Sequence, residues 1–202
     1  MGEAPRRAGY LAQAWLVVVL ALLYGGGLAA VETLVGGRIA ENRRQETYAA
    51  IPYLVPGADP GHTGELLLVG DDGRETKVYQ AVGPAGEHLG WVVPASGQGF
   101  GGAIEVLVGL DAELGTITGL YVLEQRETPG LGDHIRGDAF RSQFRGRPAE
   151  VPLSVVKLEA EAEHEIRAIT GATISSESVA NIVNQALANL RGPLARQAGG
   201  GG

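Results

Sequence analysis

The sequence contains no cysteine. This absence excludes disulfide bonds, iron–sulfur clusters held by thiolates, and haem attached through a Cys-x-x-Cys-His motif. Histidine is scarce, and the four residues lack the close spacing of a metal site, so we predict no bound metal. The four are His62, His88, His134 and His164. Any electron transfer by this chain would therefore require an organic cofactor.

A net positive charge and the signature of a serine hydrolase are missing as well. The formal net charge of the 202 residues is −7, whereas nucleic-acid binding requires a basic face that displaces counterions from phosphates. We therefore exclude nucleic acid as a partner. The sequence has no Gly-x-Ser-x-Gly nucleophile elbow. Because cysteine is absent too, an independent hydrolase is disfavoured.

Charge is absent from the apolar run Leu11–Val31, in which Gln13 is the only strongly polar residue. A run of about 20 apolar residues is long enough to cross a bilayer as a helix. Arg6 and Arg7 precede the run and Glu32 follows it. By the positive-inside rule, this charge distribution keeps the N-terminus in the cytoplasm and exports the rest of the chain.

A cleaved signal peptide is the alternative to a retained anchor. Gly27-Leu28-Ala29 resembles a small-residue cleavage site. The apolar run is longer than the usual signal-peptide core of about 7–15 residues, which favours a retained anchor. Both alternatives place the folded domain outside the cytoplasm.

The remainder of the chain alternates β-prone runs with turns and ends in a helical pattern. Glycine-rich or polar turns separate the strands of each pair, as in hairpins. The expected elements are strands at 76–82, 88–93, 103–110 and 116–123, one or two short helices within 130–147, a strand within 151–158, and a helix from Ser178. This order predicts an α+β domain with a mainly antiparallel sheet and a C-terminal helix.

The segment Thr170–Ser176 comes directly before the most regular helical pattern, in which apolar residues recur on one face from Val179 to Leu190. Thr173 is therefore expected just before a helix N-terminus. Unpaired N–H groups and the positive pole of the helix dipole favour a phosphate there. The alternative is an ordinary helix start with Ser175 as the N-cap.

Three glycine-containing segments follow predicted strands: Gly97–Gly102, Glu127–Gly132 and Thr170–Thr173. Each alone can be a tight turn, the commoner use of clustered glycine. Together, and in this order, they resemble the membrane-anchored FMN-binding subunits of ion-pumping redox complexes. The similarity is closest to the G subunit of the Rnf electron-transport complex, with the C subunit of the sodium-translocating NADH:quinone reductase as a relative. It extends over nearly the whole chain and includes the runs GQGFGGAIEVLVGLD, ETPGLGDHI and TGATISS.

The resemblance implies that FMN is attached covalently, through a phosphoester, to the hydroxyl of Thr173 by a separate flavin transferase. It also implies a loop beside the flavin, in which Thr128 and backbone amides reach polar atoms and Leu131 covers apolar ring surface. The expected cofactor-binding residues are Thr173, Thr170, Gly171, Ala172, Ser175, Glu127, Thr128, Gly130 and Leu131. No catalytic residue is expected.

The resemblance further implies an electron-carrier subunit, not an independent enzyme, in the bacterial inner membrane. Its partners would be the other membrane subunits of an Rnf-like complex, and its main domain would be periplasmic. The expected segments are a cytoplasmic N-terminus (1–10), a transmembrane anchor (11–34), a stalk or linker (35–60), the FMN-binding domain (61–192) and a disordered glycine-rich tail (193–202).

Two residues depart from the family pattern. Arg167 stands six residues before Thr173, where an Asp is common, and Gln125 replaces a frequent His two residues before Glu127. Two alternatives therefore stay open. One is an FMN-bearing domain of another extracytoplasmic electron-transfer system, and the other is a flavin-free, membrane-tethered assembly module in which Thr173 only caps its helix.

Overall fold

The computed structural model describes residues 7–199, which divide into two compact units between Gln45 and Glu46. Residues 1–6 of the expected cytoplasmic N-terminus and residues 200–202 of the expected tail lie outside this range. Helix α1 (Arg7–Leu54) begins in the first unit and ends in the second. Its most apolar 18-residue window has a mean hydropathy of 2.2 and is not buried against protein. By length and composition, this helix can cross a membrane, as a retained anchor or a signal sequence would.

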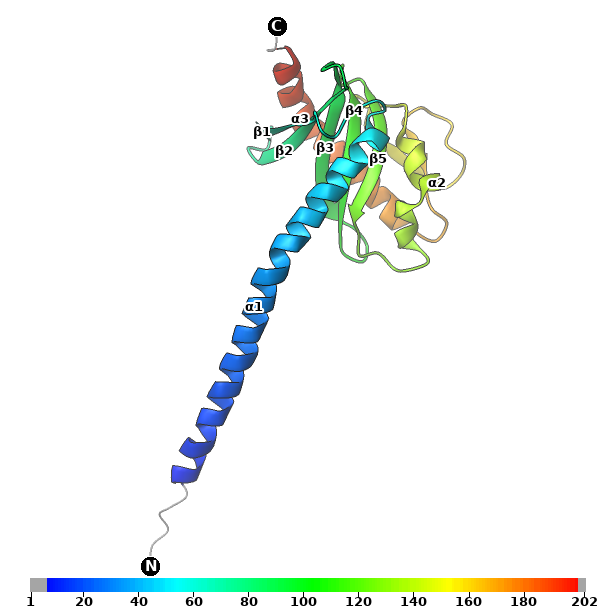
Figure 1. Cartoon of the computed structure of the whole chain (residues 1–202). Coiled ribbons are helices and arrows are strands. Elements are labelled where there is room, and N and C mark those ends of the chain that lie inside the picture. Colours follow the sequence, from blue (N-terminus) through cyan, green and yellow to red (C-terminus); the bar gives the residue numbers. More distant parts are fainter. Residues whose placement is uncertain (1–6, 200–202) are drawn as a thin grey trace, which may run out of the picture. The chain divides into compact units, whose positions relative to one another are not determined.

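The second unit is built on one antiparallel sheet, whose six strands are hydrogen-bonded in sequence order (Figure 1). The strands are β1 (Gly64–Val69), β2 (Glu75–Val82), β3 (His88–Gln98), β4 (Ala103–Asp111), β5 (Thr116–Glu124) and β6 (Arg147–Pro148). Each connects to the next as a hairpin, except that a helical segment separates β5 from β6. This confirms the expected antiparallel sheet.

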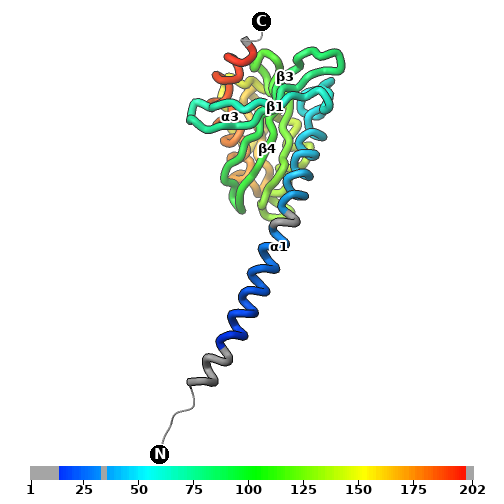
Figure 2. Tube along the Cα trace, turned by 60° about the vertical axis from the view of Figure 1, so that its left-hand side comes forward, coloured from blue at the N-terminus to red at the C-terminus, as the bar shows by residue number. Residues whose placement is uncertain are grey.

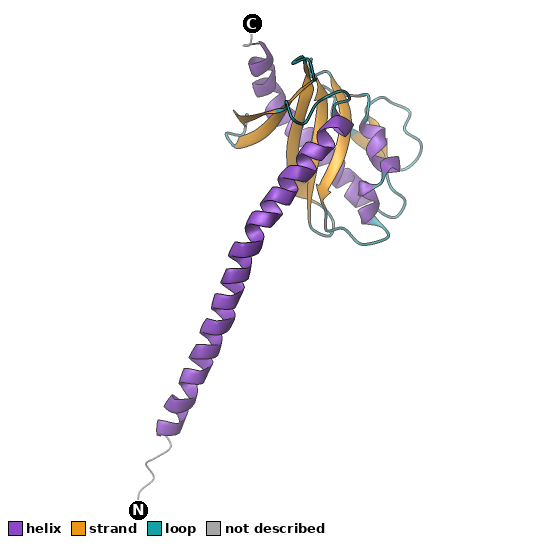
Figure 3. Ribbon diagram, in the orientation of Figure 1, coloured by secondary structure: helices purple, strands orange, loops and turns teal. Residues whose placement is uncertain are grey.

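Short helical turns and one long helix complete the unit, as the colouring of Figure 3 shows. The remaining elements are η1 (Gly132–Arg136), α2 (Asp138–Arg141), η2 (Ser142–Phe144), β7 (Ser154–Val156), β8 (Glu165–Arg167) and α3 (Thr173–Gly199). Strands β7 and β8 form a separate parallel pair. The α+β class and the C-terminal helix are confirmed, whereas α3 continues beyond residue 193, where we expected a disordered tail. Leu194 is fully buried, so this last part of the helix still packs against the domain.

The sheet is covered on both faces, because successive side chains of a strand point to opposite sides. On one face, Val106 and Val108 of β4 pack with Val183 of α3 in the larger core. On the other face, Leu107 packs with Ile51 near the end of α1 in a second core. Figures 1 and 2 show the last turns of α1 and helix α3 on opposite sides of the sheet.

A pair of glycines makes room for the end of α1 on its face of the sheet. Gly109 of β4 lies opposite Gly119 of β5. A Cβ atom at Gly109 would lie 2.7 Å from the carbonyl oxygen of Leu54, and one at Gly119 would lie 3.3 Å from the Cα atom of Leu54. The fully buried Leu54 therefore sits directly on the sheet backbone, and the last turns of α1 are part of the domain core.

We expect Leu54→Ala to destabilise the domain by about 2–5 kcal/mol, because the glycines beneath it have no side chains that could refill the cavity. Urea unfolding of the full chain in detergent measures this change. Ile39→Ala, on the same helix at a position that is half exposed, is the control and should cost less than about 0.5 kcal/mol. Equal stabilities of the two variants would contradict a core role for the end of α1.

His88 begins β3 and packs edge-on against Trp91, with 4.8 Å between the ring centroids. Both ring nitrogens of His88 are buried, and neither has a hydrogen-bond partner in the described part of the chain. Burial lowers the pKa of His88 below its ordinary value. The backbone of Ala81 raises this pKa by a smaller amount, and it forms no hydrogen bond with the ring. The fold therefore favours the neutral ring.

Because the folded state disfavours the protonated ring, the unfolded chain binds more protons as the pH falls below about 6.5, the ordinary pKa of histidine. The stabilisation from neutral His88 is complete above that pH and is lost as the pH falls toward the lowered pKa of the folded state. We expect His88→Phe to reduce the loss of stability between about pH 7.5 and about pH 5.5, measured by urea unfolding. His134→Gln, at an exposed position, controls for the removal of one histidine. An unchanged pH dependence in His88→Phe would contradict this account.

Candidate functional site

The three glycine-containing segments meet at one end of the sheet and line a common pocket of about 330 Å³. Gly99–Gly102 is the turn between β3 and β4, the Glu127–Gly132 loop follows β5, and the third segment leads into α3. The lining residues are Phe100, Glu127, Thr128, Leu131, Gly132, Gly171, Ala172, Thr173, Ile174 and Ser175. Segments more than 70 positions apart in the chain therefore form one cavity.

Seven of the nine expected site residues line this pocket, and two do not. Gly130 adopts a positive φ of 76° at the tip of its loop, a conformation that favours glycine. Thr170 is exposed just before the pocket. Phe100, Gly132 and Ile174 line the pocket but were not among the expected residues. Three signals in the sequence could have identified these residues. Ile174 is adjacent to Thr173, Phe100 is an aromatic residue within a glycine-rich turn, and Gly132 ends the Glu127–Gly132 motif.

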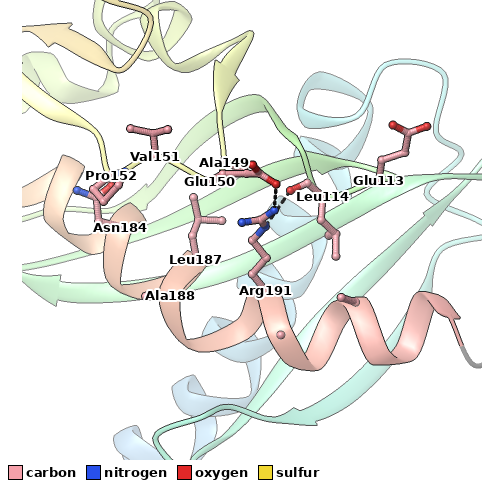
Figure 4. Close-up of a pocket in the computed structure, with 12 residues that line it drawn as sticks. Glu113, Leu114, Ala149, Glu150, Val151, Pro152, Asn184, Leu187, Ala188 and Arg191 are labelled. Atoms are coloured by element: carbon pink, nitrogen blue, oxygen red, sulfur yellow. Dashed lines mark hydrogen bonds and ion pairs between the residues drawn. The ribbon is translucent and has the colours of Figure 1, made fainter.

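A larger depression of about 430 Å³ lies elsewhere along α3 and contains none of these residues (Figure 4). The guanidinium of Arg191 pairs with Glu150 and donates a hydrogen bond to the carbonyl of Leu114. The side-chain amide of Asn184 donates to the carbonyl of Leu153 and accepts from its N–H group, both at 2.8 Å. The polar groups of this depression are already bonded to other parts of the domain. Its larger volume therefore does not make it the candidate ligand site.

Glu127 is the central side chain of the smaller pocket. It is only 5% exposed. Its Oε1 atom accepts a hydrogen bond from the backbone N–H of Gly101 at 2.9 Å, and its Oε2 atom accepts one from the hydroxyl of Ser175 at 2.5 Å. Gln125 accepts a hydrogen bond from the backbone N–H of Glu127. The carboxylate thus joins the β3–β4 turn to the first turn of α3.

Helix α3 begins at Thr173, earlier than the sequence suggested, so the assignment of Ser175 as an N-cap is wrong. The Ser175 hydroxyl lies inside the first turn and donates to Glu127 instead of capping the helix. The chain can turn into the helix at this point because Gly171 adopts a positive φ of 82°. The Ser176 hydroxyl accepts from the N–H of Ile169 and donates to the carbonyl of Ala172.

Thr173 is the residue of the first turn of α3 that lines the pocket and whose hydroxyl makes no described hydrogen bond. Its side chain is half-buried and lines the cavity. The neighbouring Ser175 and Ser176 are buried, and both of their hydroxyls are already hydrogen-bonded. Because the first N–H groups of a helix lack acceptors within the helix, this end also offers donors and a positive dipole pole to an anion.

Three large apolar side chains stand exposed around the pocket. Phe100 is 65% exposed, Ile174 55% and Leu131 46%. Exposed apolar groups that gather at a cavity with a few polar groups are typical of a ligand site. This arrangement suits a ligand with a flat apolar part and an anionic part.

Arg167, which departs from the family pattern, does not line the pocket. It ends β8, where its guanidinium pairs with Glu159 at the surface. Its backbone N–H and carbonyl are held by the side-chain amide of Gln143. The Arg167 side chain is therefore engaged outside the cavity.

The fold and the pocket define a domain of the FMN-binding class. The sequence profile of the FMN-binding domain matches residues 99–188, which include the β3–β4 turn Gly99–Gly102 and the two other glycine-containing segments in full. Two crystal structures have a related fold. One is NqrC of Shewanella oneidensis (TM-score 0.56, 20% identity, 71% of this chain and 72% of that one). The other is the C subunit of the sodium-translocating NADH-quinone reductase of Parabacteroides distasonis (TM-score 0.53, 25% identity, 59% and 63%).

The chain belongs to the family of G subunits of ion-translocating oxidoreductase complexes. It is 33% identical to the G subunit of the sodium-translocating ferredoxin:NAD(+) oxidoreductase complex of Acetobacterium woodii, over 85% of this chain and 87% of the relative. It is 30% identical to the G subunit of the ion-translocating oxidoreductase complex of Pseudomonas aeruginosa, over 92% and 90%. The family resemblance inferred from the sequence is confirmed.

Glycine at position 132 is required by the packing around Glu127. A Cβ atom there would lie 2.7 Å from the Ser175 hydroxyl oxygen and 2.8 Å from the Cβ atom of Glu127. We expect Gly132→Ala to destabilise the domain by about 1–3 kcal/mol through overpacking. Gly115→Ala is the control, because its new methyl group would approach other atoms no closer than 3.9 Å. Thermal unfolding of both variants measures the difference, and equal midpoints would refute tight packing at Gly132.

Proposed function

We propose that this protein is the flavin-bearing electron-transfer subunit of a membrane complex that couples electron transfer to ion translocation, with FMN joined through a phosphoester to Thr173. The observation that carries the proposal is the place of Thr173 at the start of α3, where it lines the pocket and its hydroxyl makes no described hydrogen bond. The names of the relatives support the type of complex, since they are subunits of ion-translocating oxidoreductases.

The choice of Thr173 rests on the state of the neighbouring hydroxyls. Ser175 is committed to Glu127 and Ser176 to the backbone, so using either would break a buried hydrogen bond. Thr170 is exposed and outside the pocket lining. Thr128 also lines the pocket, but it belongs to the loop after β5 and not to the first turn of α3, whose N–H groups favour a phosphate.

The residues of the pocket fit FMN in two respects. Gly171 and Ala172 leave the backbone beside Thr173 accessible, so a phosphate can approach the N–H groups and the positive pole of α3. The exposed Phe100, Leu131 and Ile174 offer apolar surface to the flavin ring. The volume of 330 Å³ is at the low end for ligand pockets, about 300–1,000 Å³, so part of the cofactor would stay at the surface, as exchange of electrons with a partner requires.

Bound FMN would supply the reversible electron transfer. The contribution of the protein would be to orient the ring, to fix its phosphate and to tether the domain to the membrane. We further propose that residues 1–10 are cytoplasmic, that 11–34 form the anchor, and that the domain lies outside the cytoplasm. Other subunits would exchange electrons with it and carry the ion pathway, and a flavin transferase would attach the FMN.

We expect Thr173→Ala to abolish covalent flavin while changing the stability by no more than about 0.5 kcal/mol, since no described hydrogen bond depends on this hydroxyl. Intact mass and in-gel flavin fluorescence of the denatured chain, co-expressed with a flavin transferase, measure attachment. Thr170→Ala, with the same chemical change three residues earlier, is the control and should retain the flavin.

Covalent flavin that persists in Thr173→Ala would exclude Thr173 as the attachment site. An unmodified wild-type chain, with a transferase shown to be active on another substrate, would reject the covalent linkage and favour a flavin-free assembly module.

A further inference from the structure

Glu127 is the only acidic or basic side chain among the buried residues of the described chain. A buried carboxylate is costly unless hydrogen bonds or opposite charges compensate for the lost hydration. Its two hydrogen bonds therefore fix its position firmly, and they come from segments that lie 26 positions before it and 48 positions after it. The carboxylate is the point at which the three segments of the pocket are joined.

We propose that Glu127 is a positioning residue that holds the β3–β4 turn and the first turn of α3 in register and thereby sets the shape of the pocket at Thr173. This inference deepens the proposed function, on which its second part rests. This role requires no direct contact with the cofactor, because each carboxylate oxygen accepts a hydrogen bond from a different segment of the protein.

The packing around the carboxylate supports a fixed position. A Cβ atom at Gly99 would lie 2.3 Å from Oε1 of Glu127, and one at Gly132 would lie 2.9 Å from Oε2. Glycines from two of the three segments thus enclose the carboxylate closely. The Gly99 N–H donates to the carbonyl of Gly102 at 2.7 Å, which closes the same turn that the carboxylate holds through Gly101.

The negative charge of Glu127 also acts on the pocket. Glu127 lines the pocket, and its carboxylate lies beside the first turn of α3, the positive pole of that helix. This attraction strengthens the link between loop and helix. A negative charge beside a bound redox group also disfavours the addition of electrons to that group. Glu127 therefore lowers the reduction potential of the cofactor that the pocket holds.

Three substitutions separate these effects. Glu127→Ala removes both hydrogen bonds and the charge. Glu127→Gln removes the charge but keeps a similar shape, because its carbonyl can accept from Gly101 and its amide can donate to the rotatable Ser175 hydroxyl. Ser175→Ala removes one hydrogen bond and keeps the charge. Glu113→Gln, at an exposed position in the turn between β4 and β5, is the matched control for the loss of one negative charge.

The first measurement is amide hydrogen exchange on the full chain in detergent, made without a transferase so that no flavin is present. We expect Glu127→Ala to speed exchange about tenfold or more in peptides covering 99–102 and 173–177. Ser175→Ala should speed it chiefly in 173–177, whereas Glu127→Gln and Glu113→Gln should stay near wild type. Unchanged exchange in both Glu127→Ala and Ser175→Ala would overturn the positioning role, and if Glu127→Ala does not fold, Ser175→Ala alone decides.

The second measurement uses chains loaded with flavin by a transferase. We expect Glu127→Ala to reduce the loaded fraction, and Glu127→Gln to load and to show a more positive midpoint potential than Glu113→Gln. A midpoint potential that is equal in Glu127→Gln and Glu113→Gln would overturn the electrostatic part. Absence of flavin from the wild-type chain would instead overturn the proposed function, and the exchange result would still decide whether Glu127 positions the loops.

Discussion

A single antiparallel sheet must be covered on both faces, and the rest of the domain follows from how this chain meets that requirement. Val106 and Val108 face helix α3, whereas Leu107 between them faces the end of α1. The helix that carries the apolar N-terminal segment therefore also completes the core of the folded domain. Gly109 and Gly119 allow the close approach, because a Cβ atom at position 109 would overlap the carbonyl oxygen of Leu54 and one at position 119 would crowd its Cα atom.

The position of α3 on the sheet also determines where the pocket forms. Its residue Ile182 packs against Gly97 near the end of β3, where a Cβ atom would lie only 2.6 Å away. The start of α3 is thereby brought to the glycine turn that follows β3 and to the loop that follows β5. Glu127 then fixes these parts to one another. Thr173 and Ser175 of the first turn of α3 both line the cavity, and the Ser175 hydroxyl is already bonded to Glu127.

This arrangement suits a tethered electron carrier. The FMN-binding domain of its family carries an organic redox cofactor, which suits a chain that has no cysteine to ligate a cluster. A covalent bond to the first turn of a helix would hold such a cofactor where N–H groups and the helix dipole stabilise its phosphate. The membership in the family of G subunits agrees with this combination of one apolar helix and one FMN-binding domain.

Local sequence patterns predicted most of the central strands, the C-terminal helix and the motifs of the site. Two β-prone runs on either side of a turn predicted the strands at 103–110 and 116–123, which correspond to β4 and β5. The edge strand β1 (Gly64–Val69) was not predicted, since GELLLV is a short apolar run without clear alternation and its role as a strand depends on pairing with β2.

The tertiary structure alone decided how these parts combine. Ser175 has the local pattern of an N-cap, but a carboxylate 48 residues earlier in the chain holds its hydroxyl within the first turn of α3. Phe100 and Ile174 line one pocket because the fold brings the β3–β4 turn to the start of α3. The sequence by itself determined which residues could bind an anion and a flat ring. Long-range packing determined which of them face one cavity, because that depends on contacts between segments that no local pattern encodes.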